Sequence, residues 1–306
     1  MMRFRVSGFK FQVSGRRLQV AAILGLCLLS FVLPVRADNA EDVIARVLEN
    51  VAKLKAADPE AVPMAFWDFD GTIIKGDVSE GLTEDGKQVF KGLVQRTIEA
   101  GLSTVYPKDG GWEKYAKEYP RLCEIGLWFG WPYNGQIYEG LEVSKLDAFC
   151  RDEYAAVYRK WFFRFSVKAL KALEQAGVEN YIVSASPECY VRNAAESLGL
   201  PRERFRGIRI EECVGRMTTR IVYPIPCGEG KVENVREIVL ARPHGVAVAG
   251  FGNSYRTDGP FLRYIATQPS LPGGVRGVSV MLNGGEPRSG YTEHFTTFDE
   301  NDVVGL

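Results

Sequence analysis

The stretch AFWDFDGT, at residues 65–72, decides the fold expected for this chain of 306 residues. The apolar run 62–67 predicts a buried strand, and two aspartates separated by one residue follow it. Because side chains alternate along a strand, Asp68 and Asp70 are expected to share a side just past the strand's end. Open α/β sheets bind their ligands at that carboxyl edge.

Two carboxylates at one point repel each other unless a hard cation such as Mg2+ neutralises them. Gly71 permits a sharp turn, and the hydroxyl of Thr72 can tie the loop. The alternative interpretation is an ordinary turn, because Asp and Gly are common turn residues. Matching residues further along the chain have to decide between the two.

Acidic and basic residues are equal in number, 38 of each, but they are unevenly distributed. Residues 1–37 hold six basic residues and no acidic one, so the remainder has 32 basic against 38 acidic residues. A net charge near −6 argues against nucleic acid as a partner.

The segment 1–37 has the pattern of an export signal. Basic residues precede the apolar run 20–35, and Val35-Arg36-Ala37 ends it like a small-residue cleavage site. The run is short for a spanning helix, which needs about 20 apolar residues. A cleaved signal peptide is therefore favoured over an uncleaved anchor, and a periplasmic or extracellular location is expected. Only this segment is expected to contact the membrane. Arg16-Arg17 is a weak sign of twin-arginine export, and Cys27 is assigned to the signal.

Five cysteines follow the signal, and an odd number leaves at least one unpaired within the chain. They are Cys123, Cys150, Cys189, Cys213 and Cys227. Two interpretations stay open: a disulfide between Cys213 and Cys227 across a predicted hairpin, or five small buried side chains.

The rest of the chain divides into a core and an insert. Residues 38–74 and 165–306 are assigned to an α/β core, and residues 75–164, helical in pattern and rich in aromatics, to an inserted helical cap. The core elements expected after the insert are helix 166–175, strand 181–183, a helix from Pro187 to Gly199, strands 205–213 and 217–223, a helix from 228 to about 240, and strands 245–249 and 275–282. The expected fold class is α/β, a Rossmann-like parallel sheet with an inserted helical cap and a small β-hairpin.

Further candidate residues stand at the ends of these elements. Ser184 follows a strand, where it can hold a phosphate or simply cap a helix. Lys231 lies in the first turn of a helix, where the helix dipole disfavours a cation, so it is a functional candidate as well as a possible surface lysine. Asn253 and Asp258 follow another strand and offer oxygen ligands for a metal, or turn-forming side chains.

Taken in order, these residues resemble the haloacid dehalogenase superfamily of phosphohydrolases. DFDGT at 68–72 matches its first motif, and Ser184 after a strand matches the second. Lys231 matches the third, and Gly252-Asn253 with Asp258 the fourth. The stretch 207–231, with its hairpin and GEGK, is similar to the phosphoserine-phosphatase-like branch.

The resemblance implies a Mg2+-dependent phosphatase that hydrolyses a small phosphomonoester through an aspartyl-phosphate. In that scheme Asp68 is the nucleophile and Asp70 the general acid and base. The phosphate would be bound by Ser184, Lys231 and Thr72, and the metal by Asp68, Asp70 and Asn253 or Asp258. The family's fourth motif usually begins with Asp where this chain has Asn253, which puts the metal affinity in doubt.

An insert directly after the first motif implies a cap that excludes bulk water and large substrates. Asp77 and Glu80 lie close enough in sequence to the motif to contact a cationic leaving group, and cap aromatics suit a quaternary ammonium. The chain is somewhat similar to exported phosphorylcholine phosphatases, so choline phosphate is one hypothesis and a phosphoserine-like substrate another.

Two other functions stay open on this scaffold: an aspartyl-phosphate phosphotransferase or mutase, and a binding protein without activity. A histidine-based hydrolase is disfavoured because His244 and His294 are the chain's two histidines. The oligomeric state is not predicted.

Overall fold

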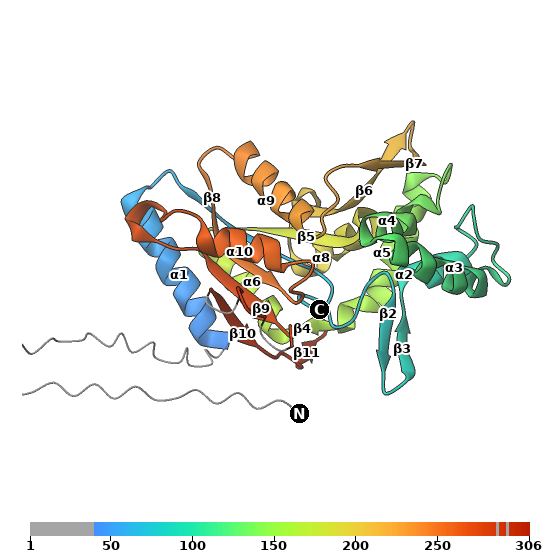
Figure 1. The fold of residues 1–306 in the computed structure, drawn as a ribbon, viewed down its shortest axis with the longest axis horizontal. Coiled ribbons are helices and arrows are strands. Elements are labelled where there is room, and N and C mark those ends of the chain that lie inside the picture. Colours follow the sequence, from blue (N-terminus) through green and yellow to red (C-terminus); the bar gives the residue numbers. More distant parts are fainter. Residues whose placement is uncertain (1–39, 286–287, 292–293) are drawn as a thin grey trace, which may run out of the picture. The chain divides into compact units, whose positions relative to one another are not determined.

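A sheet of seven strands is built around β1 (Val62–Trp67) in the computed structural model, which describes residues 40–285, 288–291 and 294–306. The strand order is β10-β9-β8-β1-β5-β6-β7 (Figure 1). The other strands are β5 (Glu179–Pro187), β6 (Phe205–Cys213), β7 (Arg216–Val222), β8 (Gly245–Gly252), β9 (Val278–Leu282) and β10 (Phe295–Phe298). All neighbours pair in parallel except β6 and β7, which are antiparallel. The predicted Rossmann-like α/β class is confirmed.

Helices cover both faces of this sheet, as the alternation of β1 requires. Met64 and Phe66 pack in one apolar cluster with residues of α9 (Glu229–Ala241) and α10 (Gly259–Thr267). Trp67 packs in the opposite cluster with residues of α1 (Ala40–Ala57) and α6 (Arg164–Gln175). Because β1 is buried on both sides, its last residue delivers the following loop to a defined point at the sheet's edge.

The segment predicted as a helical cap, residues 75–164, contains four α-helices and one hairpin, and a 3-10 helix and a short strand close it. The helices are α2 (Leu93–Glu99), α3 (Gly111–Ile125), α4 (Leu127–Gln136) and α5 (Val143–Ala156), and the hairpin pairs β2 (Gly81–Glu84) with β3 (Lys87–Lys91). The purely helical expectation was wrong at 81–91. Asp85 and Gly86, both at positive φ, form the tight turn that an Asp-Gly pair favours, and this dipeptide was the missed signal.

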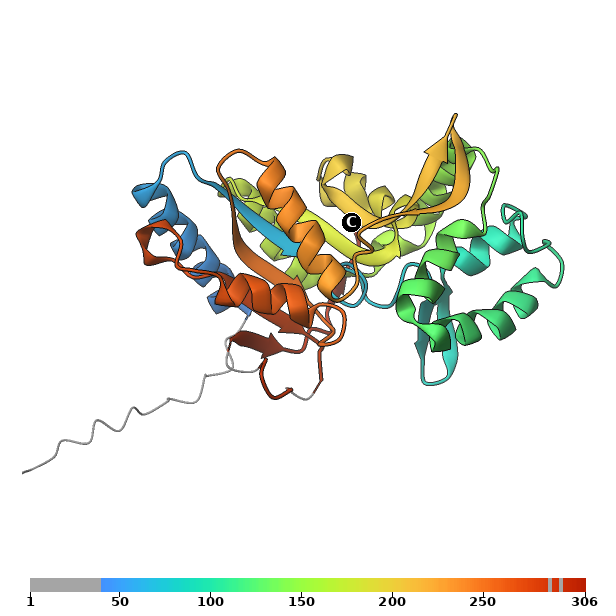
Figure 2. The ribbon, with the colours of Figure 1, turned by 45° about the horizontal axis from the view of Figure 1, so that its top comes forward.

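This helical segment contacts the β6–β7 hairpin directly. The main-chain N–H of Met217 donates to the carbonyl of Leu141 at 2.9 Å, and the N–H of Gly140 donates to the carbonyl of Met217 at 2.8 Å. Figure 2 shows the hairpin (yellow to orange) beside the green helices. The described residues belong to one compact unit, and the exact division into core and cap stays a prediction.

The helix expected from Pro187 to Gly199 is interrupted. Pro187 ends β5, and α7 (Glu188–Val191) and α8 (Ala195–Leu198) are separated by a 3-10 turn, η2 (Arg192–Ala194). The Asn193 side chain donates to the carbonyl of Cys189 at 2.7 Å. Such a side-chain bond competes with the helical hydrogen-bond ladder, which accounts for the break.

Smaller elements complete the fold. They are β4 (Phe162–Phe163) paired with β11 (Val303–Val304), and the 3-10 helices η1 (Tyr158–Lys160), η3 (Arg202–Arg204) and η4 (Pro272–Gly274). The five cysteines from 123 to 227 are free, so the Cys213–Cys227 disulfide is not formed. Only Cys150 and Cys189 are buried, so the alternative of five buried cysteines is also wrong. The predicted signal 1–37, including Arg16-Arg17 and Cys27, lies outside the described residues. Within the described part of the chain, no helix is both long and apolar enough to cross a membrane.

Candidate active site

The loop that follows β1 carries the two aspartates of the first motif. The N–H of Asp68 donates to the carbonyl of Phe251 at 2.8 Å, which continues the pairing of β1 with β8 past the strand's end. Gly71 has a φ of +74°, a conformation that glycine adopts without steric cost. The N–H of Ile73 then donates back to the carbonyl of Phe69 at 2.8 Å, so the loop is a tight, closed turn.

Asp68 is buried, and both of its carboxylate oxygens are engaged. Nζ of Lys231 lies 2.5 Å from Oδ1, and the hydroxyl of Thr72 donates to Oδ2 at 2.9 Å. Burial raises the pKa of Asp68 to about 7, and the negative charge of Asp258 acts in the same direction, while Lys231 opposes the shift. Ionisation of Asp68 near neutral pH therefore depends on the neighbouring ammonium group.

Lys231, in the first turn of α9, is wholly buried between two carboxylates. Its Nζ lies 2.6 Å from Oδ1 of Asp258 as well as beside Asp68. Burial disfavours the charged form, but Asp258 and Asp68 together raise the pKa of Lys231 above the usual lysine value. The other oxygen of Asp258 accepts N–H bonds from Asn253 and Ser254, at 2.9 and 3.0 Å. These contacts explain a lysine at a helix end where the dipole disfavours it.

Asp70 is held by two serines of β5 and by a main-chain N–H of the loop after the motif. The hydroxyls of Ser186 and Ser184 donate to Oδ2 at 2.6 and 3.3 Å, and the N–H of Val78 donates to Oδ1 at 2.7 Å. The hydroxyl of Ser79 donates in turn to Ser186 at 2.8 Å. Burial raises the pKa of Asp70 to about 6, and the hydrogen bond from Ser186 limits the rise. A carboxyl group that titrates near neutral pH suits general acid–base chemistry.

A cavity of about 370 Å³ opens onto these carboxylates. Five of the predicted site residues line it: Asp68, Asp70, Asp77, Glu80 and Asn253. The other four are not among its lining residues and are wholly buried: Thr72, Ser184, Lys231 and Asp258. The structure thus separates the side chains that a ligand can reach from those that hold them in place.

Asp77 and Glu80 form an acidic wall of this cavity. Oδ1 of Asp77 accepts the N–H groups of Ser79 and Glu80, at 2.7 and 2.9 Å, which fixes the turn after the motif. Loss of hydration raises the pKa of Asp77 well above its usual value, and the charges of Asp70 and Glu80 add to the shift. Glu80 accepts a hydrogen bond from the Tyr119 hydroxyl at 3.2 Å.

Several lining residues were not predicted. They are Ser79, Tyr119, Leu127, Trp131, Asn134, Ala185, Ser186, Ser254, Arg256 and Thr257. A signal for Ser186 was present, because it lies two residues after Ser184 on β5, and alternation places such a pair on one side of a strand. Cap aromatics were expected in the site as a group, and Tyr119 of α3 and Trp131 of α4 are two that line the cavity. Which of them do so had no local signal, since that depends on how the helices fold over the sheet.

Asn253 and Asp258, left open as metal ligands, have different surroundings. A Cβ atom added at Gly71 would come within 1.9 Å of Nδ2 of Asn253, so this amide lies directly against Gly71. Both carboxylate oxygens of Asp258 are instead taken up by Lys231 and by main-chain N–H groups. Asn253 is therefore the member of this pair that reaches the cavity.

The donor atoms around this point fit a hard dication. Mg2+ takes oxygen ligands and keeps several of its waters, so one or two carboxylates from the protein suffice. Asp68 offers a carboxylate, Asp70 a main-chain carbonyl and Asn253 an amide oxygen. Over the described ranges, no three His, Cys, Asp or Glu side chains gather as a metal-ligand group. The negative charge available to a metal is thus lower than it would be with Asp at position 253.

The chain belongs to the haloacid dehalogenase-like hydrolase family, whose model matches residues 65–263, more than half of the sequence. The predicted family and its hydrolase class are confirmed. No curated protein matches the chain.

Solved structures with the same fold include two proteins of unknown function. One, from Bordetella pertussis Tohama I, is 17% identical with a TM-score of 0.55, over 78% of this chain and 99% of that chain. The other, from Anaerococcus prevotii DSM 20548, is 16% identical with a TM-score of 0.51, over 81% and 87%. A phosphoserine phosphatase, solved as a phospho-aspartyl intermediate analogue, is 14% identical with a TM-score of 0.43, over 80% and 96%. At these identities the first two likenesses support the fold alone.

Proposed function

We propose that this hydrolase is a phosphatase that cleaves a small phosphomonoester through an aspartyl-phosphate, with Mg2+ as its cofactor. The observation that carries the proposal is the environment of Asp68. One carboxylate oxygen lies against the buried cation Lys231, the other accepts the Thr72 hydroxyl, and the side chain lines a cavity beside Asp70.

The chemistry runs in two steps. In the first, an oxygen of Asp68 attacks phosphorus, the bond between phosphorus and the ester oxygen breaks, and Asp70 gives a proton to the departing alkoxide. In the second, Asp70 takes a proton from water as that water attacks phosphorus, and the phosphorus–oxygen bond to Asp68 breaks. Inorganic phosphate and the free carboxylate of Asp68 result. The pKa of Asp70, about 6, lets the same group serve as acid and then as base.

Lys231 contacts Asp68 from the buried side, away from the cavity. In the proposed scheme it would hold Asp68 in the attacking position, and its positive charge would offset negative charge that develops on the phosphoryl oxygens. Ser184 does not line the cavity, and its hydroxyl oxygen accepts the N–H of Ser186 at 3.0 Å. In this proposal the phosphate contact expected of Ser184 is therefore assigned to the side chain of Ser186, which does line the cavity. Asp68, the carbonyl of Asp70 and the amide of Asn253 would hold Mg2+. When bound, the metal supplies charge neutralisation for the transferring phosphoryl group.

The test is hydrolysis of a generic aryl phosphate by the chain from residue 38 onward. Wild-type protein is assayed with Mg2+ and with chelator, beside Asp68→Asn. We expect activity that requires Mg2+ and that falls by about a thousandfold or more in Asp68→Asn, which lacks the nucleophile. Activity that survives Asp68→Asn would refute the nucleophile assignment. Product analysis with an added alcohol distinguishes hydrolysis from phosphoryl transfer to an acceptor.

The acidic wall supports a cationic leaving group, such as that of choline phosphate. Glu80 is oriented by Tyr119, whose hydroxyl accepts a hydrogen bond from Asn134 Nδ2 at 3.2 Å. Trp131 lines the same cavity, so carboxylates and aromatic rings surround one space. Aromatic faces and carboxylates are the groups that bind quaternary ammonium ions. We therefore retain choline phosphate as the substrate hypothesis for this cavity.

A further inference from the structure

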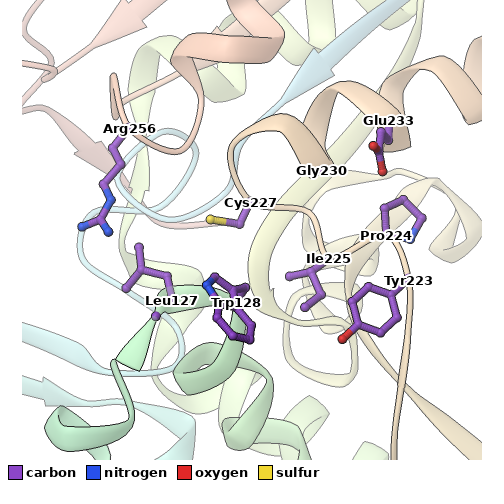
Figure 3. Close-up of a pocket in the computed structure, with 10 residues that line it drawn as sticks. Leu127, Trp128, Tyr223, Pro224, Ile225, Cys227, Gly230, Glu233 and Arg256 are labelled. Atoms are coloured by element: carbon purple, nitrogen blue, oxygen red, sulfur yellow. The ribbon is translucent and has the colours of Figure 1, made fainter. Parts of the chain in front are cut away.

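A second cavity, of about 560 Å³, adjoins the catalytic cavity. The two share Leu127 and Arg256 in their linings, so they meet at these two side chains. Figure 3 shows Leu127 and Trp128, at the start of α4, facing Ile225 and Cys227 of the loop before α9. The volume lies within the range of small-molecule sites, roughly 300–1,000 Å³.

The lining of this second cavity is mostly apolar and aromatic, and Glu233 and Arg256 are its charged members. Trp128 and Tyr223 are 60% and 68% exposed, and Phe129 is the third large exposed aromatic among the described residues. Two of these three side chains therefore line one cavity. Exposed apolar groups gathered at one place are typical of a binding site, because a ligand that covers them removes apolar surface from water.

The position of the Trp128 indole depends on Gly126. A Cβ atom added at Gly126 would come within 2.4 Å of Nε1 of Trp128. Any larger residue at position 126 must displace the ring from its present place in the lining. Arg256 stands at the junction of the two cavities, exposed to solvent. It supplies a positive charge at the point where a phosphate in the catalytic cavity would connect to the second cavity.

Building on the proposed phosphatase function, we propose that the second cavity is a subsite for the leaving group, and that it takes an extended apolar, aromatic moiety. Trp128 and Tyr223 would cover the faces or edges of such a group, and Leu127 would contact it where it leaves the catalytic cavity. A leaving group as small as choline would occupy the catalytic cavity alone and leave this subsite unfilled, so the subsite inference competes with choline phosphate as the substrate. The subsite therefore favours aryl or similarly extended phosphomonoesters over short alkyl ones.

The experiment compares 1-naphthyl phosphate with ethyl phosphate in four proteins: wild type, Trp128→Ala, Gly126→Ala and Phe129→Ala. The ratio of kcat/KM values for the two substrates is measured in each. Their intrinsic reactivities cancel when one ratio is compared between variants. We expect the ratio to fall about tenfold in Trp128→Ala, because stacking on the indole is lost, and less in Gly126→Ala. Phe129→Ala is the matched control, an exposed aromatic of the same helix that lines neither cavity, and its ratio should equal that of wild type.

A binding measurement separates this inference from the proposed function. The dissociation constant of 1-naphthyl phosphate is measured in an Asp68→Asn background, with and without Trp128→Ala, and ethyl phosphate serves as the short comparison. Weaker binding of the naphthyl ester alone in the Trp128 variant supports the subsite, whatever the turnover. Equal affinity in both proteins, or an unchanged ratio of kcat/KM values, would show that the cavity is only a solvent-filled entrance. Failure of wild type to hydrolyse either ester would count against the phosphatase function and leave the binding result to decide the subsite.

Discussion

Nζ of Lys231 lies 2.5 Å from Oδ1 of Asp68, and both side chains are buried. The same ammonium group contacts Asp258 at 2.6 Å, so one cation serves two carboxylates. Removing a buried cation leaves its partners without compensation, which costs more than the ion pair itself contributes.

Lys231→Met should therefore lower the free energy of unfolding by about 3–5 kcal/mol, besides abolishing activity. Urea unfolding at pH 7 measures the loss. Lys145→Met is the control, because its 3.7 Å contact with Glu142 is exposed and such pairs contribute little. A Lys231→Met protein as stable as wild type would show that the two buried contacts of Lys231 do not stabilise the fold.

The raised pKa values of Asp68 and Asp70 predict a pH dependence of stability in metal-free protein. An unfolded aspartate has a pKa of about 3.9, whereas the folded values are about 7 and about 6. Between the unfolded and folded pKa values, the folded state binds more protons than the unfolded state. The two carboxyl groups therefore make their full contribution to the free energy of unfolding below about pH 4, and that contribution is lost as the pH rises towards 7. The slope is at most about 1.4 kcal/mol per pH unit for each group.

This pH effect is measured by urea unfolding in the presence of chelator from pH 4.5 to 7.5. Asp70→Asn removes one titrating group. The difference in unfolding free energy between variant and wild type removes the contributions that the rest of the chain makes to both proteins, and this difference should change with pH. A difference that stays constant across the range would contradict the raised pKa of Asp70.

Asn253→Asp should tighten Mg2+ binding by about tenfold, because the side chain that lies against Gly71 then carries a negative charge. Calorimetric titration with Mg2+ measures this without reference to activity. Asn134→Asp adds the same charge elsewhere in the cavity and should have a smaller effect. If both variants bind Mg2+ equally, Asn253 is not a ligand and only the overall charge matters.

Gly71→Ala should reduce activity by about 100-fold, since the new methyl group must displace the Asn253 side chain. Gly86, in the β2–β3 turn, is a matched control because it has the same φ of +74° and no atom lies within 4 Å of an added Cβ. Both alanine variants should lose about 1 kcal/mol of stability through backbone strain. Only Gly71→Ala should lose turnover of an aryl phosphate, and equal losses in the two would point to strain alone.

Glu80→Gln tests the acidic wall. The KM for choline phosphate should rise about tenfold, because its cationic leaving group loses contact with a carboxylate. The KM for ethyl phosphate, whose leaving group is uncharged, should not change. Glu84→Gln, on the hairpin and paired with Lys75 at 2.6 Å, serves as the control. A parallel rise for both substrates would mean that Glu80 maintains the cavity and does not recognise charge.

Much of this fold could be predicted, because its main elements have local patterns. The apolar run of β1, the alternating strands β6 and β7, and the helix after Gly228 were all located within a few residues. The errors fell where a local signal was missed or overridden. A hairpin turn lies at Asp85-Gly86, where a helical stretch was predicted. The helix predicted from Pro187 to Gly199 is interrupted at Asn193, whose side chain bonds to the carbonyl of Cys189.

The candidate site divides in the same way. Local patterns were enough to pick out Asp68 and Asp70, since a strand end and a tight turn lie within eight residues. Contacts between distant parts of the chain decided the rest: Lys231 meets Asp68 across 163 positions and Asp258 across 27. The same long-range packing turned Asn253 towards the cavity and Asp258 away from it, and placed Trp128 of α4 opposite the loop before α9. Hydrogen-bonding patterns repeat over a few residues and can be recognised in a sequence, whereas the meeting of remote side chains depends on how whole helices and strands pack.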